Sequence, residues 1–213
     1  PRKFKIAVAL PPRNDVDVFS NCLGYVGISE NSQIVGYNVL VGGGLGMTHG
    51  KTTTFPRLAD VIGFCTPEQA VQVAEEVVKI QRDFGDRSDR RHARLKYTIE
   101  DRGVEWFKEE LNQRLGWDLQ PARDFLFEST TDRYGWNQDA DGSWTYGLFF
   151  EGGRLRDKPK LAIREIASSI PCEFRLTANQ NLVIARVGNE EKGKIDEILA
   201  KHGVLLPSDL SGL

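Results

Sequence analysis

The sequence has few cysteines and few histidines, and this shortage excludes several kinds of site. Cys22, Cys65 and Cys172 lie far apart, and no Cys-x-x-Cys pair occurs. The three histidines do not stand at a ligand spacing with them, so the chain by itself offers no predicted metal site. Dispersed cysteines, odd in number, are typical of a reducing compartment, and we expect a cytoplasmic protein.

The sequence also lacks an excess of charge and any long apolar run. The formal net charge is -2 and the pI is about 6.0, so we expect no nucleic-acid partner. No apolar run is long enough to cross a bilayer and no secretory signal is visible, so we expect no membrane partner. The 213 residues, 40% of them hydrophobic, can form the core of one domain or two.

Periodic patterns predict mixed α and β structure. We expect a strand over 6–10, a hairpin formed by 23–29 and 33–41, and a helix from Thr66-Pro67 to Gly85. A second helical region is predicted over 88–115, with an interruption near Gly103. Residues 121–133 look irregular and are the predicted domain boundary. Beyond it we expect strands over 144–150, 173–177 and 181–187 and helices over 160–170 and 190–202, as in a ferredoxin-like layer.

Three cations open the chain in Pro1-Arg-Lys-Phe-Lys5, directly before the apolar run Ile6-Ala-Val-Ala-Leu10. If this run is a strand, its two-residue period puts Lys3 and Lys5 on one face at the entrance of the strand. Two ammonium groups directed at one point would make an anion site. A solvated basic chain end is the alternative, because lysines are ordinarily exposed.

A block of glycines, Gly42-Gly-Gly-Leu-Gly46, follows the predicted hairpin. Glycines allow backbone N–H groups to approach a flat or anionic ligand, and polar residues crowd the next positions from Thr48 to Thr54. The block lacks the lysine of a P-loop and the spacing of a dinucleotide fingerprint, and no nucleophile elbow occurs elsewhere. A tight turn or bulge is the alternative interpretation.

Two further clusters of polar residues are candidates for ligand binding. The first is a cationic run made of Arg87, Arg90, Arg91, Arg94 and Lys96. In a helix, four of these arginines share one face, which is either solvated or binds carboxylates or phosphates. The second is Thr177-Ala-Asn-Gln-Asn181, whose amides suit either a polar ligand or the capping of a turn.

Taken together and in this order, these segments resemble the middle of an assimilatory sulfite reductase haemoprotein, of the sirohaem nitrite/sulfite reductase family, and the ferredoxin-dependent type in particular. The segments that carry the resemblance are Pro1-Arg-Lys-Phe-Lys5, Asn38-Val-Leu-Val-Gly-Gly-Gly-Leu-Gly46, Thr54-Phe-Pro-Arg57, Asp89-Arg90, Arg94-Leu-Lys-Tyr97 and Thr177-Ala-Asn-Gln-Asn-Leu182. The resemblance covers nearly the whole chain. It implies a sirohaem and 4Fe–4S enzyme that reduces sulfite to sulfide with six electrons from ferredoxin or another donor.

The resemblance also implies roles for individual residues. Lys3 and Lys5 match the lysines that bind sulfite and supply protons, since each reduction step needs protons as well as electrons. Arg94 matches a cation on a sirohaem carboxylate. The other positions that match cofactor-contacting residues are Arg2, Gly43, Gly44, Arg57, Lys96, Gln180 and Asn181. The many carboxylates of sirohaem explain why basic residues would gather at one site.

The implied fold class is α+β. A sirohaem-binding α/β domain is expected over residues 1–130, followed by a ferredoxin-like half-domain over 134–206. The four cluster cysteines of the family lie downstream of the Thr-Ala-Asn-Gln-Asn segment, and further sirohaem arginines lie upstream of Pro1. We therefore expect an internal fragment that lacks N- and C-terminal parts of the same protein and is inactive by itself.

Three alternatives remain open on the sequence, one of them a nucleic-acid-binding role for the cationic run over 87–96. Sirohaem nitrite reductase shares the scaffold, and nitrite, like sulfite, is a small anion; the Pro-Arg-Lys-Phe-Lys form favours sulfite. An alternative of a different class is a non-catalytic module that binds an anion or a protein partner.

Overall fold

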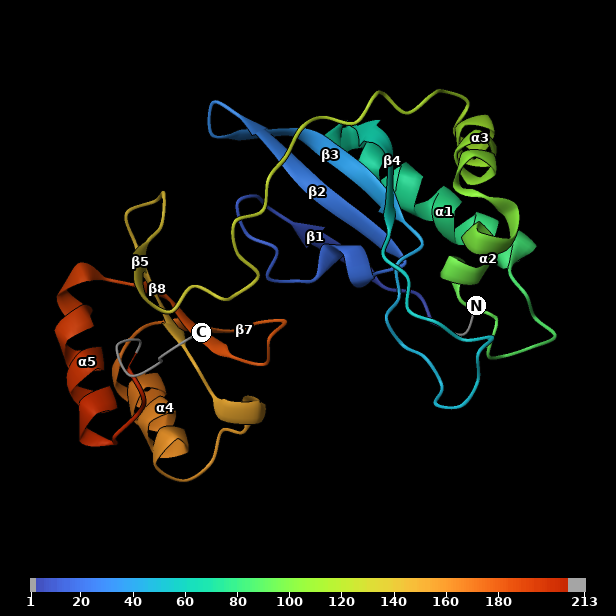
Figure 1. Ribbon diagram of the computed structural model, residues 1–213. Coiled ribbons are helices and arrows are strands. Elements are labelled where there is room, and N and C mark those ends of the chain that lie inside the picture. The colour runs from blue at the N-terminus through green and yellow to red at the C-terminus, as the bar shows by residue number, and fades with distance from the viewer. Residues whose placement is uncertain (1–2, 207–213) are drawn as a thin grey trace. The chain divides into compact units, whose positions relative to one another are not determined.

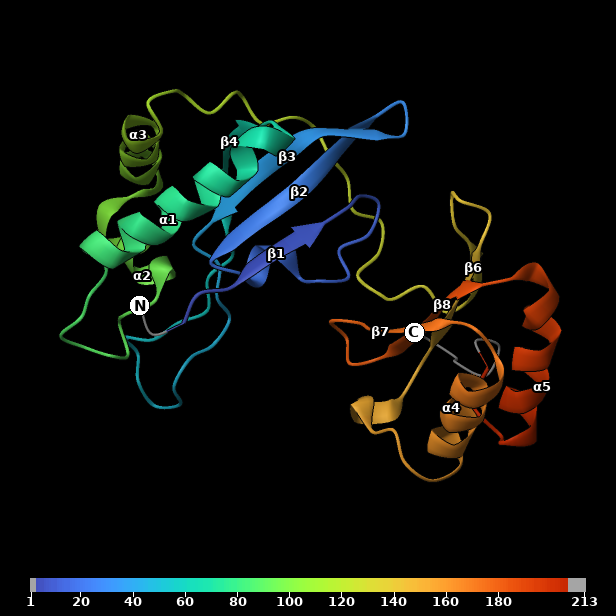
Figure 2. The same cartoon turned by 180° about the vertical axis from the view of Figure 1, so that it is seen from behind.

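The computed structural model describes residues 3–206 of the chain, and the chain divides after Thr130 into two units. Each unit contains one four-stranded sheet with helices packed on one of its faces (Figure 1 and, from behind, Figure 2). The fold class is therefore mixed α and β, as the sequence predicts.

The sheet of the first unit has the strand order β1-β2-β3-β4. Strand β1 (Ile6–Ala9) runs parallel to β2 (Leu23–Glu30), and β2 forms the predicted antiparallel hairpin with β3 (Gln33–Val41). Strand β4 (Asp60–Cys65) completes the sheet antiparallel to β3 and was not among the predicted elements. The loop that joins β3 to β4 contains the glycine block.

Three helices follow β4. The 3-10 turn η2 (Pro67–Gln69) leads into α1 (Ala70–Phe84), and the side chain of Gln69 accepts a hydrogen bond of 2.9 Å from the N–H of Thr66. This is the helix start that the Thr-Pro pair predicts. The next two helices are α2 (Leu95–Arg102) and α3 (Val104–Leu115). Gly103 separates them with a φ of 90°, a left-handed angle that glycine adopts without strain.

A helical face formed by Arg87, Arg90, Arg91 and Arg94 is wrong, because residues 85–94 are not helical. The side chain of Asp86 accepts hydrogen bonds from the backbone N–H groups of Ser88 and Asp89, at 2.7 and 3.1 Å. Short acidic side chains that bind their own backbone in this way compete with helix formation. The second helical region therefore begins only at Leu95.

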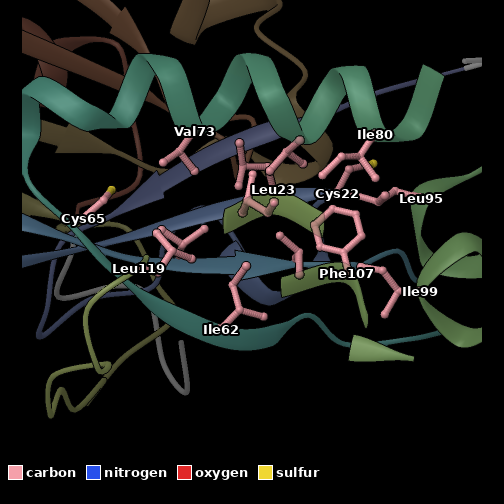
Figure 3. Close-up of a cluster of buried hydrophobic side chains, with 14 of the residues drawn as sticks. Cys22, Leu23, Ile62, Cys65, Val73, Ile80, Leu95, Ile99, Phe107 and Leu119 are labelled. Atoms are coloured by element: carbon pink, nitrogen blue, oxygen red, sulfur yellow. The ribbon is translucent and has the colours of Figure 1, made fainter. Parts of the chain in front are cut away.

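The main core of the first unit lies between its sheet and its helices. Helix α1 packs Val73, Val77 and Ile80 against residues of β2, and Phe107 of α3 joins them (Figure 3). Val73 and Val77 recur at helical spacing within the predicted helix, and the structure buries both. The opposite face of the sheet is covered in part by the irregular segment before Thr130, whose Phe125 and Phe127 lie within 6.4 Å of the ring of Phe19.

The second unit has the strand order β5-β6-β8-β7, with all neighbours antiparallel. Its strands are β5 (Gly135–Gln138), β6 (Trp144–Leu148), β7 (Glu173–Leu176) and β8 (Leu182–Val187). Its helices are α4 (Asp157–Ser169) and α5 (Lys192–Lys201), and the short 3-10 turns of the chain are η1 (Val18–Ser20), η3 (Glu151–Gly153) and η4 (Asn189–Glu191). Ile166 of α4 and Ile195 and Leu199 of α5 are fully buried against the sheet. Strand β5 was not predicted, whereas the other strands and both helices were.

No helix within residues 3–206 is both long and apolar enough to cross a membrane.

Candidate functional site

A cationic cavity of about 240 Å³ lies in the first unit. Its walls come from the loop between β3 and β4, from the segment that leads into α2, and from the residues before β1. The loop and that segment extend from the same end of the unit (Figures 1 and 2). The lining residues are Lys3, Gly46, Met47, Thr48, Thr54, Arg91, Arg94, Lys96 and Tyr97.

The charge of this cavity is of one sign. Four of the lining side chains are cations, Lys3, Arg91, Arg94 and Lys96, and none of the described lining residues is acidic. Guanidinium and ammonium groups bind carboxylate, phosphate and sulfite oxygens through charge-assisted hydrogen bonds. The cavity is therefore suited to an anion, either a small inorganic one or the carboxylate of a larger ligand.

Arg94 has unused hydrogen-bonding capacity in this cavity. One of its terminal nitrogens, Nη2, donates to the sulfur of Cys22 at 3.3 Å. Its Nε is buried and has no hydrogen-bond partner, the single buried side-chain N or O atom of this kind among residues 3–206. A buried N–H without an acceptor costs free energy, and such a group in a native structure calls for an explanation. An anionic ligand that accepts from Nε would supply one.

Lys96 lines the same cavity but has a different environment. The residue is 1% exposed, and its Nζ donates to the backbone carbonyls of Gly44 at 3.0 Å, Gly46 at 2.8 Å and Phe55. Burial, and secondarily the charge of Arg94, lower the pKa of Lys96. The sequence reading assigned Lys96 to the cofactor, whereas the structure gives its three N–H donors to the loop itself.

The two middle glycines of the block have different neighbours. A Cβ atom on Gly43 would meet the backbone oxygens of Phe19 and Asn21 at 2.2 and 2.6 Å, so this position needs glycine for close packing of the chain. A Cβ atom on Gly44 would meet Nη2 of Arg94 at 3.0 Å and a carbon of Lys96 at 3.2 Å. Gly44 therefore leaves room for the cations of the cavity.

Arg57 is occupied by partners within the chain. Its guanidinium bonds to Asp60 at 2.6 Å, to Glu100 at 3.0 Å and to the carbonyls of Gly42 and Leu58. The two carboxylates help to raise the pKa of Arg57 against the effect of its burial. These contacts fix the end of the loop next to β4 and do not line the cavity.

The opening lysines lie at different places. Lys3 lines the cavity, whereas Lys5 is exposed, is absent from the described lining, and has its carbonyl bonded to the N–H of Leu23 at 3.1 Å. Both precede β1, which begins at Ile6. Arg2, the remaining cation of the opening segment, lies outside the described residues.

In the second unit, the turn between β7 and β8 is organised by a buried carboxylate. Asp132, 6% exposed, accepts hydrogen bonds from the side chains of Thr177 at 2.6 Å, Asn179 at 3.0 Å and Asn181 at 2.8 Å. The other end of the Asn181 amide accepts from the N–H of Phe150 at 2.9 Å. Asn181 is therefore saturated by bonds within the unit.

Gln180 stands at the exposed point of this turn. Its φ of 67° is left-handed, which is uncommon for a residue other than glycine and asparagine. The bonds from Asp132 to its neighbours hold the backbone that imposes this angle. Of the two amides predicted in this turn, Gln180 is the exposed one, with its side chain next to Gly153, while Asn181 supports the turn.

A larger cavity of about 610 Å³ lies in the second unit and is a weaker candidate. Its lining combines Arg154 and Arg156 with Glu151, and includes several apolar side chains such as Phe149 and Leu205. The acid offsets part of the positive charge. No buried side-chain polar atom of this unit within the described residues lacks a partner, in contrast to the Nε of Arg94.

Sequence reasoning missed several residues of both sites. Tyr97 lines the cavity, Cys22 accepts from Arg94, and Asp132 organises the turn. Tyr97 lay within a segment that carried the resemblance, so a signal existed for it. A single aspartate in an irregular segment and an isolated cysteine before a strand carry no such signal.

Residues 1–119 match the family described as nitrite and sulphite reductase 4Fe-4S domain, and residues 137–202 match the nitrite/sulfite reductase ferredoxin-like half domain. The chain belongs to the nitrite and sulfite reductase family. The cationic cavity lies within the first matched stretch, and the turn around Gln180 lies within the second.

Individual relatives agree with this assignment. The chain is 56% identical to the sulfite reductase [NADPH] hemoprotein beta-component of Myxococcus xanthus over 208 residues, which are 96% of this chain and 37% of that protein. The protein of the same name from Paenibacillus sp. is 54% identical over 218 residues, with 100% of this chain and 38% of that protein covered. The chain thus spans little more than a third of the length of these curated relatives. Their names specify NADPH, whereas the sequence analysis favoured the ferredoxin-dependent type.

A solved structure supports the fold. The structure of the Mycobacterium tuberculosis NirA protein aligns with a TM-score of 0.77 at 25% identity, over 90% of this chain and 34% of that chain. The expected α+β class, with a nitrite/sulfite reductase domain followed by a ferredoxin-like half-domain, is confirmed.

Proposed function

We propose that the chain is part of an enzyme that reduces sulfite to sulfide with six electrons in sulfur assimilation. The observation that carries this proposal is the cavity of the first unit, where four cations meet without an acid and the Nε of Arg94 has no partner in the described structure. This cavity lies in the stretch that matches the nitrite and sulphite reductase domain. Relatives named sulfite reductase support sulfite as the substrate.

We further propose that sirohaem and a 4Fe–4S cluster are the cofactors of the whole protein. The fit to this chain is good for sirohaem, because its carboxylates would satisfy Arg94 and the neighbouring cations. When bound, these groups supply the iron that activates the sulfur of sulfite and the path for electrons. For the cluster, no group of three or more metal-ligating side chains occurs within residues 3–206, and we assign its ligands to other parts of the protein.

The residues of this chain would contribute charge, orientation and protons. We assign Lys3 and Lys5 to binding sulfite and to donating protons from their Nζ atoms to its oxygens, with Arg2 beside the cofactor. Arg94 binds a carboxylate of the cofactor. Gln180, an exposed residue of its turn, is also assigned to contact with the cofactor.

The remaining assignments act through the shape of the pocket. Gly43 and Gly44 let the loop pass close to the cofactor, because neither carries a side chain. Arg57 and Asn181 have their polar atoms bonded within their own units, so each supports the local fold of its own unit and contributes at most a part of its surface to the cofactor.

The electron donor and the location are proposals as well. NADPH as the source of electrons is favoured over ferredoxin by the names of the relatives. A cytoplasmic location is supported by the three cysteines, which are free thiols.

The test uses the full-length enzyme with single substitutions. Lys3→Gln and Lys5→Gln should each lower the rate of sulfite reduction by about a hundredfold or more, the usual scale of proton donation by a positioned group, with little loss of sirohaem absorbance. Lys79→Gln is the matched control, because Lys79 is a half-exposed lysine of α1 that pairs with Glu76. Unchanged turnover in both variants would remove the catalytic role of the two lysines.

Nitrite is a second candidate substrate, because the matched family is described for both anions. Assays of sulfite and nitrite on the same full-length preparation decide between them through the ratio of their kcat/KM values. A higher value for nitrite would reassign the substrate without changing the proposed cofactor site.

A further inference from the structure

Lys96 is a buried cation that forms no ion pair within the described residues. Its Nζ donates to three backbone carbonyls, those of Gly44, Gly46 and Phe55, and to no carboxylate of the described residues. An ammonium group has three N–H donors, so three carbonyls use all of them. A buried charge is tolerated when its hydrogen bonds are complete, and Lys96 meets this condition with neutral partners alone.

These carbonyls belong to two limbs of one loop. Gly44 and Gly46 lie on the limb that leaves β3, and Phe55 lies on the limb that returns toward β4. At the base of the loop, Gly44 and Arg57 exchange two backbone hydrogen bonds of 2.8 and 3.0 Å. Nearer the tip, the hydroxyl of Thr54 accepts from the N–H of Thr48 at 2.8 Å. The ammonium of Lys96 ties the limbs together between these two connections.

Two aromatic rings beside Lys96 also stabilise its charge. Its Nζ lies 4.9 Å from the centroid of the Tyr97 ring and 5.8 Å from that of Phe55. Aromatic faces attract a cation without offering it a proton acceptor. The surroundings of Lys96 thus stabilise its charge and leave no donor directed to a ligand.

We propose that Lys96 is a positioning residue, which fixes the loop between β3 and β4 and so shapes the cavity in which Lys3, Arg91 and Arg94 meet an anion. An anion that bound Lys96 directly would have to displace one of the carbonyls and leave it buried without a donor. The inference rests on the proposed anion site, but it is independent of whether the anion is sulfite, nitrite or a cofactor carboxylate.

The experiment is hydrogen exchange in the full-length protein prepared without cofactors and without sulfite. In the Lys96→Met variant, the amides of Thr48, Lys51 and Thr54 should exchange about tenfold faster or more, because the loop loses the tie between its limbs. The amides of Val77 and Ile80 in α1 should keep their rates. Lys79→Met is the matched control and should leave both sets of rates unchanged.

Unchanged exchange of the loop amides in a folded Lys96→Met protein would overturn the proposal. Because no cofactor or substrate is present, this result is distinct from a failure of the proposed sulfite reductase activity.

Amine labelling of the wild-type protein keeps the proposal testable if the variant does not fold. A residue that ties the loop is protected from an acylating reagent before any anion is added, whereas a lysine that binds the anion directly becomes protected only when the anion is present. We expect Lys96 to be labelled at least tenfold more slowly than Lys3 in sulfite-free protein. Equal labelling of the two lysines would overturn the proposal.

Discussion

Lys96 and Asp132 are buried charges of opposite sign, one in each unit, and neither forms an ion pair with another described residue. Lys96 is surrounded by backbone carbonyls of the β3–β4 loop. Asp132 is surrounded by the hydroxyl of Thr177 and the amides of Asn179 and Asn181. In both places a charge converts a loop into a defined shape by binding three neutral groups at once.

The two sites differ in the source of those groups, which are backbone atoms around Lys96 and side chains around Asp132. Every residue has a backbone carbonyl, so the sequence does not reveal which residues bind Lys96. Two of its three partners are glycines, which have no side chain to indicate a role. Asp132 accepts from side chains instead, so its partners are threonine and asparagine at fixed positions. The Thr-Ala-Asn-Gln-Asn segment is conspicuous in the sequence for this reason, whereas the role of Lys96 is not.

The largest effect is expected at the carboxylate. Asp132→Ala leaves the donors of Thr177, Asn179 and the buried Asn181 without their acceptor and should lower the free energy of unfolding of the second unit by about 3 kcal/mol. Urea unfolding followed by the fluorescence of the tryptophans measures this. Glu197→Gln, which removes an exposed carboxylate of α5, is the control and should change stability by less than about 0.5 kcal/mol. A loss below about 1 kcal/mol for Asp132→Ala would mean that the turn holds itself without the charge.

An intermediate effect is expected at the glycines of the loop that Lys96 ties. Gly43→Ala should destabilise the first unit by about 2 kcal/mol or more, because its Cβ meets backbone oxygens that cannot move aside. Gly44→Ala meets the flexible ends of Arg94 and Lys96 and should cost about 1 kcal/mol or less.

The effects of the two glycine variants on anion binding should have the opposite order to their effects on stability. Gly44→Ala displaces Arg94 and is expected to weaken sulfate binding in calorimetric titrations, whereas a folded Gly43→Ala protein should retain it. Equal losses of stability for both variants would indicate that the loop yields at either position, and that Lys96 does not hold it.

The smallest effect is expected where charge is exposed. Glu165 of α4 bonds to His202 at 2.7 Å and to Lys201 at 2.8 Å, and these contacts lower the pKa of Glu165, the bond to His202 contributing most. A lowered pKa for a carboxyl group gives stability that is present above its usual value near 4.5 and is lost as the pH falls through the lowered value. Glu165→Gln should therefore reduce stability slightly at neutral pH and not at all at strongly acidic pH, as measured by thermal unfolding across that range. A loss that persisted in acid would show that packing, and not charge, is responsible.

Much of the fold could be predicted from periodicity and turn residues. The hairpin of β2 and β3, the helix start at Thr66 and Pro67 that leads through η2 into α1, and the pairing of β7 with β8 follow from patterns that local physics imposes. Strand β4 (Asp60–Cys65) was missed because its apolar run is short and stands directly before a helix start. The supposed arginine helix failed because Asp86 and Asp89 bind nearby backbone N–H groups, an option that helical spacing alone does not reveal.

The sequence predicted which cations form the site, but not which of them face the cavity and which support the loop. The resemblance brought Lys3, Arg94 and Lys96 together, and the structure has all three in one cavity. It could not tell that Arg94 and Lys96, two cations two residues apart, have different roles. Their partners come from Cys22 and from Gly44 to Phe55, segments that are remote in the chain and reach the cavity only through the folding of the sheet.

The position of these two cations relative to α2 links binding to stability. Arg94 directly precedes the helix and Lys96 lies in its first turn, the end at which the aligned peptide dipoles are positive. Cations at this end oppose the dipole and each other. An anion that enters the cavity relieves both repulsions, so it binds the folded chain and not the unfolded one. At a concentration one hundred times its Kd, such a ligand adds about 2.7 kcal/mol to the free energy of unfolding. The anion would then act as a structural component of the first unit as well as its ligand.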